Sequence, residues 1–356
     1  MTPLGAHIAA LVASHGPIAV ADYMALALGH PVFGYYMTRD PLGAAGDFVT
    51  APEISQMFGE LIGLWCADQW QQIGTPERVV LAELGPGRGT LMADALRAVT
   101  RALPAFANAA DIHLVETSPA LRAAQARALG GRARWHDTVA TLPEGPILLI
   151  ANEFFDALPV RQFVRTPRGW CERCVRLDGE RLQFALAPDP APLPAVPDAF
   201  VHAATGAVME LSPARESVAA DIAHRIAARN GAALIIDYGH HISAPGDTLQ
   251  ALKAHQYCDP LAEPGEADVT AHVDFAALAR ACEGAGARVH GPVTQGEFLK
   301  GLGILERAAR LKRGAAPQAA QDVDRALHRL TSGDEMGDLF KAMAITSPQA
   351  HTPAGF

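Results

Sequence analysis

An acidic residue and three alternating glycines follow an apolar run in this chain. Glu83, Gly85, Gly87 and Gly89 form the pattern Glu-x-Gly-x-Gly-x-Gly, ahead of an amphipathic stretch that predicts a helix. Such a turn lets the backbone approach a ligand, and the helix N-terminus offers free N–H groups. The loop lacks the lysine of a phosphate-binding P-loop, and Thr90 stands where a dinucleotide fingerprint has its third glycine. A tight turn without a ligand is the alternative.

The glycine loop resembles the first motif of class I S-adenosylmethionine (SAM) methyltransferases. By that resemblance, Glu83 engages the ammonium end of SAM. Glu116 lies 33 residues later, at the end of the next apolar run, where an acid can accept hydrogen bonds from two ribose hydroxyls. It can alternatively favour the following helix through the helix dipole. Trp135, His136 and Asp137 are candidates to flank the adenine, although Trp135 could simply cap the edge of the sheet.

Polar and aromatic residues follow the next aliphatic run. They are Asn152, Glu153, Phe154, Phe155 and Asp156, and in open parallel sheets ligands bind beyond such strand ends. Methyl transfer requires an aligned acceptor with stabilised charge. We predict that Glu153 and Asp156 clamp a guanidinium, that Asn152 orients it, and that Phe154 or Phe155 stacks on it. A solvated turn, or a site for a neutral amine or amide, is the alternative.

Strands alternating with helices must position these residues. The alternation predicts an α/β fold with a doubly wound, mostly parallel, Rossmann-like sheet, as in class I SAM methyltransferases. The length of 356 residues exceeds the usual size of one core. We therefore expect an N-terminal helical segment at 1–75, which contributes to the cofactor site, a SAM-binding core at 76–158 and 210–295, and a C-terminal helical segment at 296–356. Substrate-side insertions are expected at 159–209, with antiparallel hairpins, and at 240–275, where residues 240–271 should be irregular.

Longer motifs give a more specific resemblance. Residues 46–56, 83–90, 152–159, 236–239, 246–250, 268–275 and 336–340 are similar to signatures of the MidA-like family, whose mitochondrial members include an arginine methyltransferase that assists assembly of respiratory complex I. The resemblance implies SAM as cofactor, S-adenosylhomocysteine (SAH) as product, and symmetric dimethylation of a protein arginine. It implies a complex I peripheral-arm subunit as a possible partner. It also implies that Asp47, Thr50 and Glu53 lie near the methionine end of SAM.

Composition excludes several other classes. The formal charge of −9 argues against a nucleic-acid binder, and no apolar run is long enough to span a membrane. The N-terminus shows no presequence, so we expect a bacterial cytoplasmic protein. Cys171 and Cys174 lack a second cysteine pair, and we expect no metal site. Two other functions stay open: a non-enzymatic assembly chaperone on a methyltransferase fold, and a small-molecule N-methyltransferase.

Overall fold

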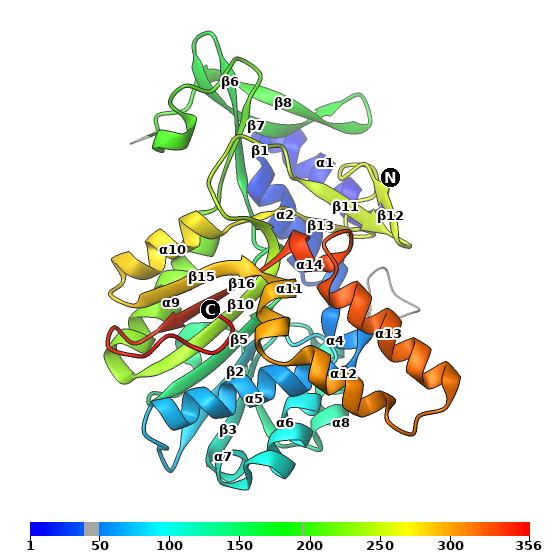
Figure 1. Cartoon of the computed structure of the whole chain (residues 1–356). Helices are drawn as coiled ribbons and strands as arrows, with labels where there is room; N and C mark the ends of the chain where they lie inside the picture. Colours follow the sequence, from blue (N-terminus) through cyan, green and yellow to red (C-terminus); the bar gives the residue numbers. More distant parts are fainter. Residues whose placement is uncertain (39–49, 194–195) are drawn as a thin grey trace. The chain divides into compact units, whose positions relative to one another are not determined.

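The computed structural model describes residues 1–38, 50–193 and 196–356 (Figure 1). The chain forms two compact units. We call one the sheet unit, which comprises Val49–Phe155, Ser217–His241 and Val273–Phe356. We call the other the hairpin unit, which comprises Met1–Phe48, Asp156–Glu216 and Ile242–His272.

The sheet unit is built on an eight-stranded sheet in the order β15-β16-β10-β5-β2-β3-β4, with β14 paired to β10. Neighbours from β10 to β4 run parallel, whereas β16 is antiparallel to both β10 and β15. The strands are β2 (Val79–Leu84), β3 (Ala110–Val115), β4 (Ala133–His136), β5 (Ile147–Asn152), β10 (Gly231–His240), β14 (Val273–Asp274), β15 (Arg288–Thr294) and β16 (Phe340–Thr346). This arrangement confirms the predicted α/β fold with a mostly parallel sheet.

Helices cover both faces of this sheet (Figure 1). Alternate residues such as Leu81 of β2 and Ile236 of β10 share one core cluster with α5, α6 and the C-terminal helices, while α9 and α10 lie on the other side. The helices are α4 (Ala51–Ile54), α5 (Gln56–Gln72), α6 (Thr90–Ala102), α7 (Pro104–Ala109), α8 (Pro119–Leu129), η1 (Val139–Thr141), α9 (Pro213–Arg229, which begins in the hairpin unit), α10 (Phe275–Gly284), α11 (Gln295–Gly301), α12 (Ile304–Lys312), α13 (Pro317–Thr331) and α14 (Met336–Leu339).

The hairpin unit contains two smaller sheets. One has the order β1-β7-β6-β9, with β8 paired to β7, and the other has the order β12-β11-β13. Its elements are α1 (Pro3–His15), β1 (Ile18–Ala19), α2 (Val20–Gly29), α3 (Tyr35–Thr38), β6 (Arg161–Thr166), β7 (Gly169–Asp178), β8 (Arg181–Pro190), η2 (Asp198–Phe200), β9 (Val208–Leu211), β11 (Gln250–Lys253), β12 (Gln256–Cys258) and β13 (Asp268–Thr270). The antiparallel hairpins expected within 159–209 are therefore present.

Two sequence expectations are corrected. The segment 296–356 was expected to be helical, but β16 runs through it with all seven residues buried. The run Lys341-Ala-Met-Ala-Ile345 has no period-two polarity because both of its faces are covered, so pattern alone does not mark it as a strand. Residues 240–271 were expected to be irregular, yet they hold β11, β12 and β13, each only three or four residues long.

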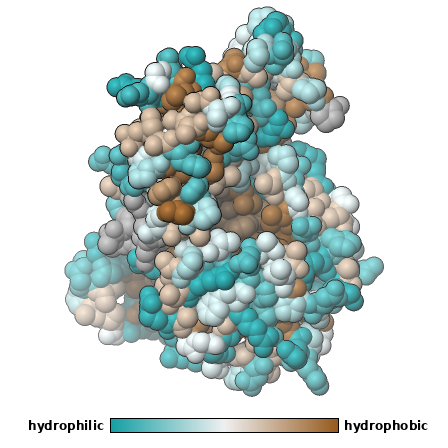
Figure 2. Space-filling view, turned by 180° about the vertical axis from the view of Figure 1, so that it is seen from behind, coloured by the Kyte–Doolittle hydropathy of each residue, from teal (hydrophilic) through white to brown (hydrophobic). Residues whose placement is uncertain are grey.

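Hydrophobic side chains on the surface lie in separate patches. The face shown in Figure 2 has such patches among mostly hydrophilic residues. Large exposed apolar residues include Ile242 and Tyr257, at 77% and 76% exposure. Among the described residues, no helix combines the length and the hydropathy that crossing a membrane requires.

Candidate active site

The glycine loop between β2 and α6 has the backbone that its sequence predicts. Gly85, Gly87 and Gly89 all have positive φ, at 57°, 53° and 83°, a region that residues with a Cβ rarely adopt. Gly89 is the left-handed N-cap of α6. A Cβ on Gly85 would lie 3.0 Å from Cδ2 of Phe154. The loop therefore passes directly beside the aromatic residue that follows β5.

Glu83 lies near the end of β2 and is 3% exposed. Its Oε2 has no hydrogen-bond partner among the described residues. Burial raises the pKa of this carboxyl to about 8, because a charged group in a low-dielectric site loses its hydration. A buried acceptor without a donor is costly, so the site favours a ligand that brings a cation or a donor to Glu83.

Glu116 follows β3, and its carboxylate has more hydrogen-bond donors around it than that of Glu83. Its Oε1 accepts the backbone N–H of Ser118 at 2.8 Å, and its Oε2 accepts Nε2 of Gln125 at 3.2 Å. Burial raises its pKa, while these donors and Arg122 oppose the rise. The Ser118 side chain caps α8, so the Glu116 carboxylate lies at the start of that helix. Glu116 can still accept hydrogen bonds from ribose hydroxyls, since a carboxylate has about four lone-pair sites.

The three residues predicted to flank adenine separate in the structure. Trp135 donates Nε1–H to Oε1 of Gln125 at 2.7 Å. The next residue is His136. Its Nε2 lies 2.8 Å from Nδ1 of His113, and its Nδ1 lies 3.2 Å from Oγ1 of Thr141. Successive residues of a strand point to opposite faces, so the His136 ring does not share the face of Trp135. The exposed Asp137 pairs with Arg122 at 2.6 Å.

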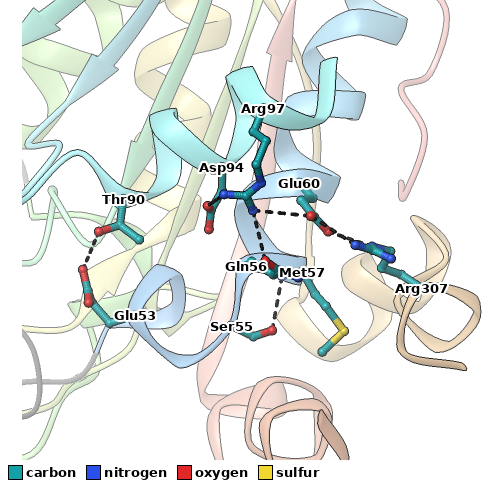
Figure 3. Close-up of polar contacts among 9 residues, drawn as sticks. All are labelled: Glu53, Ser55, Gln56, Met57, Glu60, Thr90, Asp94, Arg97 and Arg307. Atoms are coloured by element: carbon teal, nitrogen blue, oxygen red, sulfur yellow. Dashed lines mark hydrogen bonds and ion pairs between the residues drawn. The ribbon is translucent and has the colours of Figure 1, made fainter. Parts of the chain in front are cut away.

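The short helix α4 connects the glycine loop with the end of β5. Glu53 accepts the hydroxyl of Thr90, the first residue of α6, at 2.6 Å (Figure 3). The backbone N–H of Ala51 donates to Oε1 of Glu153 at 3.2 Å. Thr50 is the N-cap residue of α4 and makes no side-chain cap bond. Asp47 lies outside the described residues.

A second set of contacts anchors α5 to α6 and α12. Glu60 of α5 accepts Nε and Nη2 of Arg307 on α12, at 2.7 and 3.1 Å. Arg97 of α6 contacts Glu60 at 3.5 Å and Asp94 at 2.6 Å, and also reaches Gln56 (Figure 3). Because Glu60 is 8% exposed, this network joins three helices with partly buried charge pairs.

The end of β5 is held in an unusual conformation. Glu153 has a φ of +51°, which costs free energy for a residue with a Cβ and therefore needs support. That support comes from the Ala51 N–H and from Nδ2 of Asn152 at 3.1 Å, both on Oε1. Oδ1 of Asn152 is buried and has no partner among the described residues. The tip of β5 thus presents an oriented carboxylate beside an unused amide acceptor.

Aromatic residues and Asp237 complete this tip. The rings of Phe154 and Phe155 meet edge to face at 5.4 Å. Phe155 is fully buried and donates its backbone N–H to Oδ2 of Asp237 at 2.9 Å, while Phe154 is partly exposed. Of the two candidates for stacking, Phe154 is therefore the accessible one.

Asp156 belongs to the hairpin unit and is 6% exposed. Its Oδ1 accepts the backbone N–H of Ala157 at 2.8 Å. Its carbonyl oxygen accepts Nη2 of Arg215 at 2.9 Å, and this guanidinium also binds the carbonyls of Ala271 and His272. The predicted clamp between Asp156 and Glu153 stays a prediction.

Sequence reasoning missed Gln125, which is fully buried in α8. It binds Gly87, Glu116 and Trp135 together. It stands in an Ala- and Arg-rich stretch that no motif covers, so nothing in the pattern separates it from a solvated helix residue. Within the described ranges, no cluster of three or more His, Cys, Asp or Glu side chains has the geometry of a metal site.

The residues of the sheet unit fit SAM. Glu83 offers the ammonium group a buried acceptor that no described residue satisfies. The positive-φ glycines leave room beside the loop, and Glu116 keeps lone pairs for ribose hydroxyls. Bound at this site, SAM supplies an electrophilic methyl group on a sulfonium.

Comparison with known proteins agrees with this geometry. Residues 61–293 match the family model described as "Putative S-adenosyl-L-methionine-dependent methyltransferase". The mouse protein named "Protein arginine methyltransferase NDUFAF7, mitochondrial" is 39% identical over 98% of this chain and 85% of its own length, and its human counterpart is 37% identical over 98% and 84%.

A solved structure shares the whole fold. A "likely methyl transferase" from Burkholderia thailandensis, bound to S-adenosyl-homocysteine, superposes with a TM-score of 0.86 at 32% identity, over 99% of this chain and 93% of that one. The chain is therefore an enzyme that uses SAM, and it belongs to the MidA-like family of SAM-dependent methyltransferases.

Proposed function

We propose that this methyltransferase acts on an arginine side chain of a protein. The observation that carries the proposal is the carboxylate of Glu153, held by two donors in a left-handed backbone at the end of β5, beside Phe154 and the glycine loop. The names of the mouse and human relatives support the same substrate class.

A guanidinium suits this tip chemically. It stays protonated near neutral pH and carries five N–H donors in a planar fork. Glu153 can pair with one edge of the fork, and Oδ1 of Asn152 can accept a further N–H. Phe154 offers a ring face for stacking. Together these contacts orient one nitrogen toward the methyl donor and exclude water from it.

Three finer statements belong to the proposal. We propose symmetric dimethylation as the product, a respiratory complex I peripheral-arm subunit as the protein substrate, and the bacterial cytoplasm as the location. The resemblance in sequence to the MidA-like family supports the first two. A negative formal charge of −9 suits a cationic target.

The test uses SAM labelled in its methyl group. The purified protein is incubated with extract from cells that lack it, and in parallel with isolated complex I peripheral-arm subunits. Labelled protein is hydrolysed, and its amino acids are separated to distinguish symmetric from asymmetric dimethylarginine. The control is Gly87→Val, which places a branched side chain at a φ of 53° in the loop and should abolish labelling.

Each outcome separates the alternatives. Label in symmetric dimethylarginine of a peripheral-arm subunit supports the full proposal. Label only in small molecules, or in another amino acid, would contradict arginine methylation. Normal complex I assembly in cells that carry Gly87→Val, with no labelled protein in any extract, would favour the chaperone function.

A further inference from the structure

A single buried amide connects the separate parts of the cofactor site. Gln125 is 0% exposed and lies in the middle of α8. Its Nε2 donates to the carbonyl of Gly87 at 2.7 Å and to Oε2 of Glu116 at 3.2 Å. Its Oε1 accepts Nε1–H of Trp135 at 2.7 Å. One side chain thus contacts the glycine loop, the end of β3 and the end of β4.

Its partners leave the amide only one orientation. The indole N–H of Trp135 can only donate, so it must meet the amide oxygen. The carbonyl of Gly87 can only accept, so it must meet the amide nitrogen. Rotating the amide by 180° would break these contacts at once and leave buried groups unsatisfied, which is costly. The network therefore fixes Gln125, and Gln125 in turn fixes its partners.

We infer that Gln125 is a positioning residue that holds the methionine side and the nucleoside side of the SAM site in one geometry. Through Gly87 it sets the path of the glycine loop, and through Glu116 it sets the direction of the carboxylate predicted to bind the ribose. The inference concerns the cofactor and does not depend on the identity of the methyl acceptor. It does rest on the predicted role of Glu116.

The charges around Glu116 give the inference a measurable consequence. The guanidinium of Arg122 lowers the pKa of Glu116. Its Nε donates to the backbone carbonyl oxygen of Glu116, and its Nη2 pairs with Asp137. The ring of His136 lies against His113 instead. Burial raises the pKa of Glu116, whereas the amide of Gln125 lowers it. Without this donor, Glu116 should take up a proton at a higher pH and stop accepting from the ribose.

The experiment compares two ligands by calorimetry across pH. SAH fills both sides of the site. 5′-Methylthioadenosine carries the adenine and ribose but no ammonium, so its pH dependence reports on Glu116 and not on Glu83. The variants are Gln125→Met, which keeps the volume without the hydrogen bonds, and Gln125→Glu, which keeps an acceptor for Trp135. Gln69→Met is the matched control, because Gln69 is equally buried (1% exposed) and its side-chain amide donates to Asp68.

We expect Gln125→Met to weaken SAH binding by about tenfold or more, as for the loss of hydrogen bonds to a charged group. The pH midpoint for 5′-methylthioadenosine binding should move upward in Gln125→Met, and Gln69→Met should match the wild type. If Gln125 only fills space, Gln125→Met should lower the affinity for 5′-methylthioadenosine by the same factor at every pH. That result would overturn the inference. Wild-type binding by both Gln125 variants, or by Glu116→Gln, would overturn it as well.

Discussion

Replacing Glu83 by glutamine should stabilise the ligand-free protein at high pH and weaken its binding of SAH. In the native state the pKa of Glu83 is about 8, against 4.5 for an ordinary glutamate. The native protein therefore holds this proton more tightly than the unfolded chain does. The free energy of unfolding contributed by Glu83 is largest below pH 4.5, falls as the pH rises, and is fully lost above pH 8.

The size of the effect follows from the difference in pKa. At about 1.4 kcal/mol for each tenfold change in proton affinity, a rise from 4.5 to about 8 costs about 5 kcal/mol. Glutamine is neutral and nearly the same size, so it avoids this cost. The stability gained by Glu83→Gln should therefore be small at pH 5 and reach several kcal/mol at pH 9. Urea unfolding at each pH measures the difference in unfolding free energy between Glu83→Gln and the wild type.

Ligand binding provides a second readout of the same group. At pH 7 a carboxyl with a pKa near 8 is about nine-tenths protonated. Pairing with the ammonium of SAH favours the charged form, so binding should release close to one proton. Calorimetry in buffers of different ionisation enthalpy counts that proton, and Glu83→Gln should release none. A stability gap that does not change between pH 5 and pH 9, or equal proton release by both proteins, would refute the reasoning.

Three further changes test other parts of the site. Gly85→Ala should weaken SAH binding by about tenfold or more, because it adds strain at a φ of 57° and a Cβ 3.0 Å from Phe154. Gly130→Ala is its control, since Gly130 has a φ of 59° and an added Cβ there has nothing within 4 Å. Glu153→Gln should keep SAH binding in calorimetry but lower the methyl-transfer rate by about a hundredfold; an unchanged rate would remove Glu153 from the mechanism. Glu60→Gln should cost about 2 kcal/mol in urea unfolding, because it replaces charge-assisted hydrogen bonds to the partly exposed arginine on α12. A change below about 0.5 kcal/mol would show that the pair contributes no more than an exposed ion pair does.

The sequence predicted those parts of the fold that have strong local signals. The glycine loop and the strand ends with Glu83 and Glu116 lie where local pattern places them. The strand β16 was missed, because a strand covered on both faces has no period-two polarity. It is recognisable only through its pairing with β10 and β15.

In the candidate site, too, the sequence pattern does not predict how individual side chains are oriented or paired. Trp135 and His136 are neighbours in the sequence, but the pleat turns them to opposite faces, which a motif does not record. Gln125 has no signal in the sequence, since its role depends on three partners that are brought together by folding. Local motifs predict candidate ligands of a cofactor, whereas the residues that hold those candidates in place are recognised only in the structure.

Hydrogen-bond satisfaction, rather than residue type, separates the three acids of the site. Glu116 is bound by donors on both oxygens, so it is fixed in direction and can still accept from neutral hydroxyls. Glu153 accepts two hydrogen bonds on Oε1, which fix the direction of its carboxylate. Glu83 has a buried oxygen without a donor among the described residues, so a cation there gains the most. We therefore expect the ammonium to lie at Glu83. Glu83→Gln should weaken the binding of SAH and leave the binding of 5′-methylthioadenosine, which has no ammonium, nearly unchanged, whereas Glu116→Gln should weaken the binding of both ligands.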